Sequence, residues 1–102
     1  MLKIRLFCAA GMSTSLLERR MREAAAEQGI EVDIIARPVN EMSDNLDGID
    51  VALLGPQVRF MADQAKMMCT AHGVPMEFIP MRDYGTVNGK NVLDLARQLS
   101  GK

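Results

Sequence analysis

The stretch LKIRLFCAAGMSTS, residues 2–15, decides the fold class and points to the functional site. Residues 2–7 form a short apolar run that favours a β-strand. Cys8 follows this run, and after a loop of small residues a strongly helical segment begins. The stretch therefore predicts a strand that leads directly into a helix, with Cys8 at the carboxyl end of the strand.

Cys8 is expected to lie in a site that suits an anion. The N-terminus of a helix and the backbone amides of the loop before it both favour negative charge. The same field favours the thiolate of a cysteine, which makes the sulfur nucleophilic. Ser13, Thr14 and Ser15 add hydroxyl donors, of which helix capping explains only one or two. This combination indicates a cysteine that takes a phosphoryl group while the backbone holds it.

Strand-like and helix-like segments alternate along the rest of the chain. Short linkers between such segments favour a parallel sheet, and right-handed crossovers place helices on both of its faces. We therefore expect one α/β domain, residues 1–102, with a flavodoxin-like, four-stranded parallel sheet whose first strand lies inside. The further strands are expected at 31–37, 49–54 and 74–79, and the helices at 16–28, 40–46, 57–71 and 88–99.

Local patterns predict further details. Ser15 and Glu18 fit a capping box at the start of the first helix, and Leu16 widens the buried stripe of that helix. Charged residues in the strand at 31–37 indicate the edge of the sheet. Residues 83–85 are expected to form a loop.

The loops at one edge of the sheet are the expected place for a ligand. In folds of this class, ligands bind outside the carboxyl ends of the strands. The Cys8 loop, the Gly55-Pro56 loop and the loop from Pro80 to Tyr84 leave from that edge and are expected to converge. The sequence leaves open whether four residues in or beside these loops belong to the site or are ordinary turn and surface residues: Gln57, Arg59, Asp83 and Tyr84.

Composition excludes several classes of protein. The 102 residues are 48% hydrophobic and 25% charged, and the net charge of −1 argues against nucleic-acid binding by bulk electrostatics. No apolar run approaches the roughly 20 residues that span a membrane. The N-terminus resembles a strand rather than a signal peptide, so we expect a cytoplasmic protein with reduced thiols that reaches a membrane only through a partner.

The second cysteine and the histidine are assigned structural or surface roles. Cys69 falls on the apolar face of a predicted helix, where an inert, buried thiol is usual. His72 is the only histidine and sits at the end of that helix, at the edge of the sheet opposite the ligand loops. Because the chain has one histidine and no Cys-x-x-Cys pair, no metal site is expected. No cofactor is expected either.

The segment FCAAGMSTSLL, residues 7–17, resembles the active-site loop of the IIB components of the sugar phosphotransferase system, of the lactose/cellobiose/chitobiose type. The segment LLGPQV, residues 53–58, resembles a second signature of that family. The length is that of a free-standing IIB domain. The resemblance covers essentially the whole chain and is specific in the Cys-x-x-Gly-Met-Ser-Thr-Ser run.

This resemblance implies a mechanism. Cys8 is expected to accept a phosphoryl group from a phosphohistidine of a IIA protein. It then passes the group to a sugar, a β-linked disaccharide such as cellobiose or chitobiose, while the membrane component IIC transports it. The family pattern implies that the phosphate is held by backbone amides of Ala9, Ala10, Gly11, Met12, Ser13, Thr14 and Ser15.

A carrier of this kind presents its cysteine to two partners in turn. The surface around Cys8 is therefore expected to be accessible and partly apolar. Met12 is expected at the tip of the loop, and Gln57 and Arg59 on its rim, where they face an acidic partner.

A phosphatase is the competing enzyme. The loop also resembles that of low-molecular-weight tyrosine phosphatases, which carry Cys-x5-Arg-Ser/Thr. Counted from Cys8, the position of that arginine is occupied by Thr14. An arginine there grips the phosphate with two hydrogen bonds and stabilises the transition state. Without it, the site is expected to hold a phosphoryl group for transfer and to hydrolyse it slowly.

A non-catalytic flavodoxin-like binding module is the alternative from another class. A domain that receives a signal on aspartate needs an acidic residue at the end of the third strand, whereas Asp50 lies at the start of it. A flavin site needs aromatic residues around the ring, but the chain has no tryptophan and a single tyrosine, Tyr84. Both features favour the carrier over the binding module.

Overall fold

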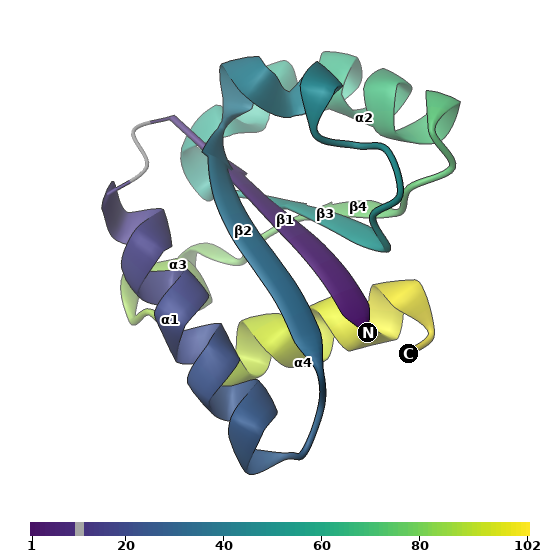
Figure 1. Ribbon diagram of the computed structural model, residues 1–102. Helices are drawn as coiled ribbons and strands as arrows, with labels where there is room; N and C mark the ends of the chain where they lie inside the picture. The colour runs from purple at the N-terminus through teal and green to yellow at the C-terminus, as the bar shows by residue number, and fades with distance from the viewer. Residues whose placement is uncertain (10–11) are drawn as a thin grey trace.

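The computed structural model describes residues 1–9 and 12–102, with the backbone alone for residues 12–14. Strands and helices alternate along the chain (Figure 1). The strands are β1 (Leu2–Cys8), β2 (Val32–Pro38), β3 (Val51–Leu54) and β4 (Met76–Phe78). The α-helices are α1 (Met12–Glu27), α2 (Ala62–Ala71), α3 (Met81–Gly85) and α4 (Gly89–Ser100), and two 3-10 helices are η1 (Val39–Asp44) and η2 (Pro56–Met61).

The four strands form one parallel sheet in the order β2-β1-β3-β4. Cys8 lies opposite Pro38 on β2, and Phe7 lies opposite Leu54 on β3. Leu54 in turn lies opposite Phe78 on β4, so the carboxyl ends of all four strands meet at one edge. The expected four-stranded parallel sheet is confirmed, with the first strand inside and the second at an edge.

Helices cover both faces of the sheet, as expected (Figure 1). On one face, α1 and α4 pack over alternate residues of the inner strands and bury Ile4, Leu6 and Leu53. On the other face, η1, η2 and α2 bury Phe7 and Leu54. Each large apolar side chain that is fully buried in these two clusters contributes about 1.5–3 kcal/mol to folding.

Helices α1 and α4 touch through their backbones at Gly89. A Cβ at residue 89 would lie 2.6 Å from the carbonyl oxygen of Arg20 and 2.6 Å from the amide nitrogen of Met21. No side chain larger than hydrogen has room there. Asn88 caps α4 by accepting a hydrogen bond from the Asn91 amide at 3.0 Å, which stabilises the first turn of α4.

The start of α1 differs from the sequence prediction. The helix begins at Met12, so Ser15 lies within its first turn and is not the N-cap. The carboxylate of Glu18 lies 2.6 Å from the guanidinium of Arg22, one turn further along. Leu16 is 39% exposed instead of widening the buried stripe, whereas Ala25 is buried with the rest of the apolar face. Hydrophobicity alone placed Leu16 on that face, but the orientation of α1 on the sheet turns it toward solvent.

Two further segments also differ. The helix expected at 57–71 is divided into η2 and α2, and Val58 has non-helical dihedral angles (φ −105°, ψ 23°). The loop expected at 83–85 belongs to the short helix α3, which follows Pro80. Within the part of the chain that the structure describes, no helix is both long enough and apolar enough to cross a bilayer.

Candidate functional site

Cys8 is the last residue of β1, the strand that lies between β2 and β3. Beyond β3, the Gly55 amide donates to the carbonyl oxygen of Phe7 at 2.8 Å. Beyond β4, the Ile79 amide donates to the carbonyl oxygen of Leu54 at the same distance. These bonds extend the sheet by one residue and fix where the neighbouring loops leave it.

The three loops converge at Gly55, as the sequence predicts. A Cβ at residue 55 would lie 3.5 Å from the Cβ of Cys8 and 3.5 Å from Cε1 of Tyr84. It would lie 2.7 Å from Oε1 of Gln57. Gly55 has ordinary extended dihedral angles, so glycine is needed here because a side chain would not fit, and not for an unusual backbone conformation. The missing side chain leaves room for residues from the ends of β1, β3 and β4 to meet.

A pocket of about 420 Å³ opens beside this point, with a largely apolar lining. Gln57 and Tyr84 are the side chains in it that carry hydrogen-bonding groups. Among the described residues, neither the Gln57 carboxamide nor the Tyr84 hydroxyl makes a hydrogen bond, so both groups are available to a ligand. The pocket is formed by Pro56, Gln57, Met81, Tyr84, Gly85 and Val87.

Cys8 itself is only 2% exposed. Its place beside the strand ends and Gly55 explains the burial. The exposed, partly apolar rim comes from neighbouring elements instead. Gln57 and Arg59 of η2 are exposed, and Met81 at the start of α3 is 74% exposed.

Three exposed arginines occupy the same edge of the sheet. Arg37 lies opposite Phe7 near the end of β2, Arg59 follows β3 in η2, and Arg82 follows β4 in α3. The Arg59 guanidinium lies 5.0 Å from the centre of the Phe78 ring, a cation–π contact worth about 0.5–1 kcal/mol at an exposed site. Sequence reasoning singled out Arg59 alone. The position of Arg37 and Arg82 at or just after strand ends was the signal that could have found the other two.

Asp83 lies in α3 and connects this helix to α4 through hydrogen bonds. It is 9% exposed, and its carboxylate accepts a hydrogen bond from Nδ2 of Asn91 at 3.1 Å. Its carbonyl oxygen accepts another from the Asn88 amide at 2.8 Å. The carboxylate is therefore held by α4, and its role is to fix the helix that carries Tyr84.

Cys69 and His72 lie away from the convergence point, as expected. Cys69 is buried on the apolar face of α2, and this burial raises the pKa of its thiol from 9.0 to about 11. His72 follows the C-terminus of α2, where its Nδ1 lies 2.8 Å from the Asp47 carboxylate. Neither side chain contributes to the edge that Cys8 occupies.

The phosphate-binding prediction falls largely outside the described residues. Ala10 and Gly11 are outside them altogether, and so are the side chains of Met12, Ser13 and Thr14. At the two ends of the predicted loop, Ala9 and Ser15 are exposed. The start of α1 at Met12 places a helix N-terminus four residues after Cys8.

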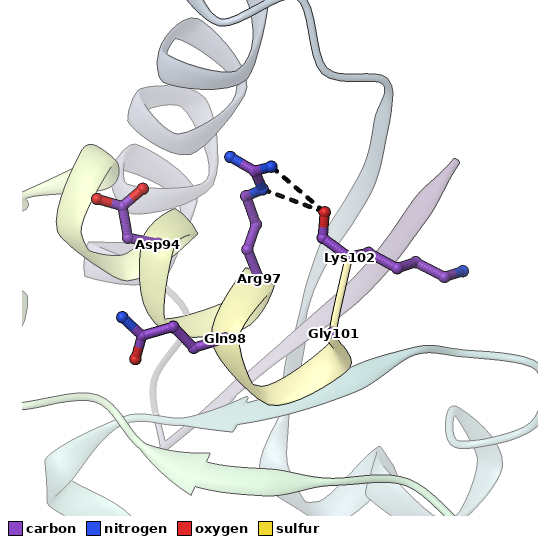
Figure 2. Close-up of a pocket in the computed structure, with 5 residues that line it drawn as sticks. All are labelled: Asp94, Arg97, Gln98, Gly101 and Lys102. Atoms are coloured by element: carbon purple, nitrogen blue, oxygen red, sulfur yellow. Dashed lines mark hydrogen bonds between the residues drawn. The ribbon is translucent and has the colours of Figure 1, made fainter.

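A second pocket, of about 380 Å³, lies at the end of α4 (Figure 2). It is lined by Asp94, Arg97, Gln98, Gly101 and Lys102, and Arg97 donates to the carbonyl oxygen of Lys102 at 3.3 and 3.4 Å. The two chain termini lie near each other at this end (Figure 1). The pocket is therefore remote from Cys8.

Asp50 belongs to the same remote end. Its carboxylate accepts a hydrogen bond from the Lys3 amide at 2.8 Å and pairs with the Lys102 ammonium at 2.9 Å. Both contacts lower the pKa of Asp50. Because this aspartate lies before β3, and not at the carboxyl edge, the structure does not support a domain that receives a signal on it.

Comparisons with known proteins agree in one family. The family model of the phosphotransferase-system lactose/cellobiose-specific IIB subunit matches residues 3–95. The galactose-specific EIIB component of Lactococcus lactis subsp. cremoris is 46% identical over 101 residues, covering 94% of each chain. The cellobiose-specific EIIB component of Lactococcus lactis subsp. lactis is 45% identical with the same coverage. The oligo-beta-mannoside-specific EIIB component of Bacillus subtilis is 34% identical over 99 residues, covering 97% of this chain and 96% of the relative.

Solved structures give the same fold. The cellobiose-specific IIB component of Borrelia burgdorferi superposes with a TM-score of 0.82 at 39% identity, covering 98% of this chain and 92% of that one. The lactose-specific IIB domain of Streptococcus pneumoniae superposes with a TM-score of 0.85 over 96% of each chain. At 19% identity, the second likeness concerns the fold alone.

Proposed function

Because the chain belongs to the lactose/cellobiose-specific IIB family of the sugar phosphotransferase system, we propose that Cys8 is the residue that carries the phosphoryl group. The group arrives from a phosphohistidine of a IIA protein. Cys8 then transfers the group to a sugar during uptake through the membrane component IIC. The sugar is a β-linked disaccharide such as cellobiose or chitobiose. Residues 1–102 act as one cytoplasmic IIB domain in this proposal.

Each transfer is a substitution at phosphorus. In the first, the Cys8 sulfur attacks the phosphorus of phosphohistidine, the P–N bond breaks, and the thiol proton ends on the released imidazole. In the second, a sugar hydroxyl oxygen attacks the phosphorus, the S–P bond breaks, and the hydroxyl proton ends on the Cys8 sulfur. The net reaction moves one phosphoryl group from a histidine to a sugar, which is the activity of a protein-cysteine phosphotransferase.

The observation that carries the proposal is the place of Cys8. It ends an inner strand of the sheet, four residues before the N-terminus of a sixteen-residue helix. That helix end favours the charge of a phosphoryl group, as do main-chain amides in the intervening segment. In this proposal, the backbone amides of residues 9–15 bind the phosphate.

Two features support a carrier over a phosphatase. Thr14 stands where a phosphatase has arginine, so no guanidinium from this position stabilises the hydrolytic transition state. A phosphatase also needs a general acid. Asp83 is the acidic residue in the segment after β4, and its carboxylate is hydrogen-bonded to Asn91. A site with neither group at hand retains the phosphoryl group until an acceptor arrives.

The surface around Cys8 favours an acidic partner. Arg37, Arg59 and Arg82 are exposed at the edge of the sheet that Cys8 occupies, although the chain as a whole has a net charge of −1. Charge of opposite sign on the partner accelerates encounter more than it prolongs the complex. This suits a carrier, which has to release each partner after transfer.

The test compares two single-cysteine variants. Wild-type protein, Cys8→Ser and Cys69→Ser are each incubated with a phosphorylated IIA protein, and intact mass is measured. We expect the wild type and Cys69→Ser to gain one phosphoryl group and Cys8→Ser to gain none. Labelling of a folded Cys8→Ser variant to the wild-type level would refute the assignment of Cys8.

A further inference from the structure

Tyr84 is placed at the candidate site by α3. Its Cε1 atom and the Cβ of Cys8 each lie 3.5 Å from the position of a Cβ at residue 55. Cε1 is bonded to the ring carbon that bears the hydroxyl, so it is the polar end of the tyrosine that lies next to Gly55. Tyr84 also lines the 420 Å³ pocket that opens there.

The two ends of the Tyr84 side chain have different environments. The ring is half-buried and packs against the hydrophobic cluster on the α1 and α4 face of the sheet. The hydroxyl makes no hydrogen bond within the described residues. A tyrosine hydroxyl at a half-buried position usually has a hydrogen-bond partner. This hydroxyl is therefore available to a group that arrives at the site.

The backbone holds Tyr84 firmly in place. Its amide donates to the carbonyl oxygen of Pro80 at 2.9 Å, and its carbonyl oxygen accepts from the Val87 amide at 3.2 Å. Val87 has a φ of +51°, a conformation that is unfavourable for a β-branched residue. Such a conformation persists only where the surrounding structure imposes it. The turn after α3 is thus fixed, and Tyr84 with it.

We propose that Tyr84 is a positioning residue, whose hydroxyl donates a hydrogen bond to an oxygen of the phosphoryl group on Cys8. This inference rests on the proposed function of Cys8. Phosphoryl oxygens are strong acceptors, and a hydrogen bond to a charged oxygen is about twice as strong as one between neutral groups. No proton changes owner in this contact. The bond orients the phosphoryl group from the side of the site that is formed by α3, the helix after β4.

The chain carries its own reporter for this contact. Tyr84 is the only tyrosine and there is no tryptophan, so tyrosine fluorescence reports on this residue alone. The wild type is phosphorylated with a phosphorylated IIA protein and separated from it before the fluorescence is measured, and labelling is followed by intact mass. We expect the fluorescence to fall when Cys8 is phosphorylated, because a phosphoryl oxygen accepts the hydroxyl proton in a hydrogen bond. The same treatment of Cys8→Ser should leave the fluorescence unchanged.

The Tyr84→Phe variant removes the hydroxyl and keeps the ring. We expect it to shift the ³¹P resonance of the phosphocysteine and to slow phosphoryl transfer about tenfold, which is the value of one hydrogen bond to a charged group. A thermal melt of the variant shows whether the fold is kept. If the variant does not fold, the fluorescence change of the wild type decides the question by itself.

The possible failures are distinct. A wild type that gains no phosphoryl group would refute both the proposed function and the role of Tyr84. Wild-type labelling on Cys8 without a fluorescence change would refute the role of Tyr84 alone. Unchanged ³¹P resonance and transfer rate in a folded Tyr84→Phe variant would also refute that role and leave the function of Cys8 intact.

Discussion

The carboxylate of Asp83 accepts a hydrogen bond from Nδ2 of Asn91 at 3.1 Å, and this bond joins the short helix α3 to α4. Residue 84, one position further along α3, lies at the point where three loops converge. The geometry assigns Asp83 to the support of the site and not to proton transfer. The two roles make different predictions for a variant without the carboxylate charge.

Asp83→Asn should retain phosphorylation within a few-fold of the wild-type rate, because the amide oxygen of asparagine can still accept from Asn91. Asn91→Ala should lower the stability by about 1 kcal/mol, since it leaves a nearly buried carboxylate without this donor. Transfer rates from phosphorylated IIA and thermal melts measure the two effects. A loss of transfer by a factor of a thousand in a folded Asp83→Asn variant would make Asp83 a catalytic acid.

Gly89→Ala should destabilise the protein by about 3 kcal/mol, at the upper end of the cost of overpacking. The new methyl group meets the backbone of Arg20 and Met21, which cannot move aside as a flexible side chain can. Gly85→Ala is the matched control, because a Cβ there has nothing within 4 Å. Chemical denaturation measures both variants. Equal stability of the two would show that α1 and α4 do not approach as closely as described.

Acid should weaken the contact between Asp50 and the chain terminus. The Lys3 amide and the Lys102 ammonium lower the pKa of Asp50 from 3.8, so folding stabilises the carboxylate form. This stabilisation is complete above about pH 4 and disappears as the pH falls through the pKa of the folded state. Asp50→Asn should therefore cost about 1 kcal/mol at about pH 7 and almost nothing at about pH 2.

The measurement is the free energy of unfolding of both proteins as a function of pH. The difference between the wild type and Asp50→Asn should shrink only below about pH 4. A difference that stays constant down to about pH 2 would show that the charge of Asp50 contributes nothing.

Hydrolysis of p-nitrophenyl phosphate should be negligible for the wild type. One oxyanion donor accelerates a reaction about 100-fold or more, and the absence of an arginine that binds the phosphate through two hydrogen bonds lowers the rate at least as much. Thr14→Arg restores a guanidinium at that position and should shorten the lifetime of the phosphocysteine. Strong phosphatase activity of the wild type that disappears in Cys8→Ser would favour a phosphatase over a carrier.

Much of the fold was predictable because its signals are local. The nearly continuous apolar run at 49–54 predicted a central strand, and its residues 51–54, which form β3, are each fully buried. The break between η2 and α2 was not predictable, because 3-10 and α-helical turns share nearly the same spacing of apolar residues. Helix α3 was expected as a loop, since Asp83-Tyr84-Gly85 has the composition of a turn. Its single turn is held by a hydrogen bond from Asn91 of the next helix, which the composition of the turn does not reveal.

The candidate site was predictable in outline. Parallel strands bring their carboxyl ends together, so the meeting of the Cys8, Gly55 and Tyr84 loops followed from the order of the elements. The burial of Cys8 did not follow, because it depends on how closely the residues at neighbouring strand ends pack. The position of Tyr84 depends on the end of β4 and on α3 together, so its nearness to Cys8 required the structure.

The most direct test of the carrier function follows one labelled phosphoryl group through the protein. Wild-type protein is phosphorylated by ³²P-labelled IIA, purified, and mixed with membrane vesicles that contain IIC and a β-linked disaccharide. We expect the label to be lost from Cys8 at the rate at which labelled sugar phosphate forms, with Cys8→Ser forming none and Cys69→Ser behaving as the wild type. Formation of sugar phosphate at the wild-type rate with Cys8→Ser would contradict the central role of Cys8.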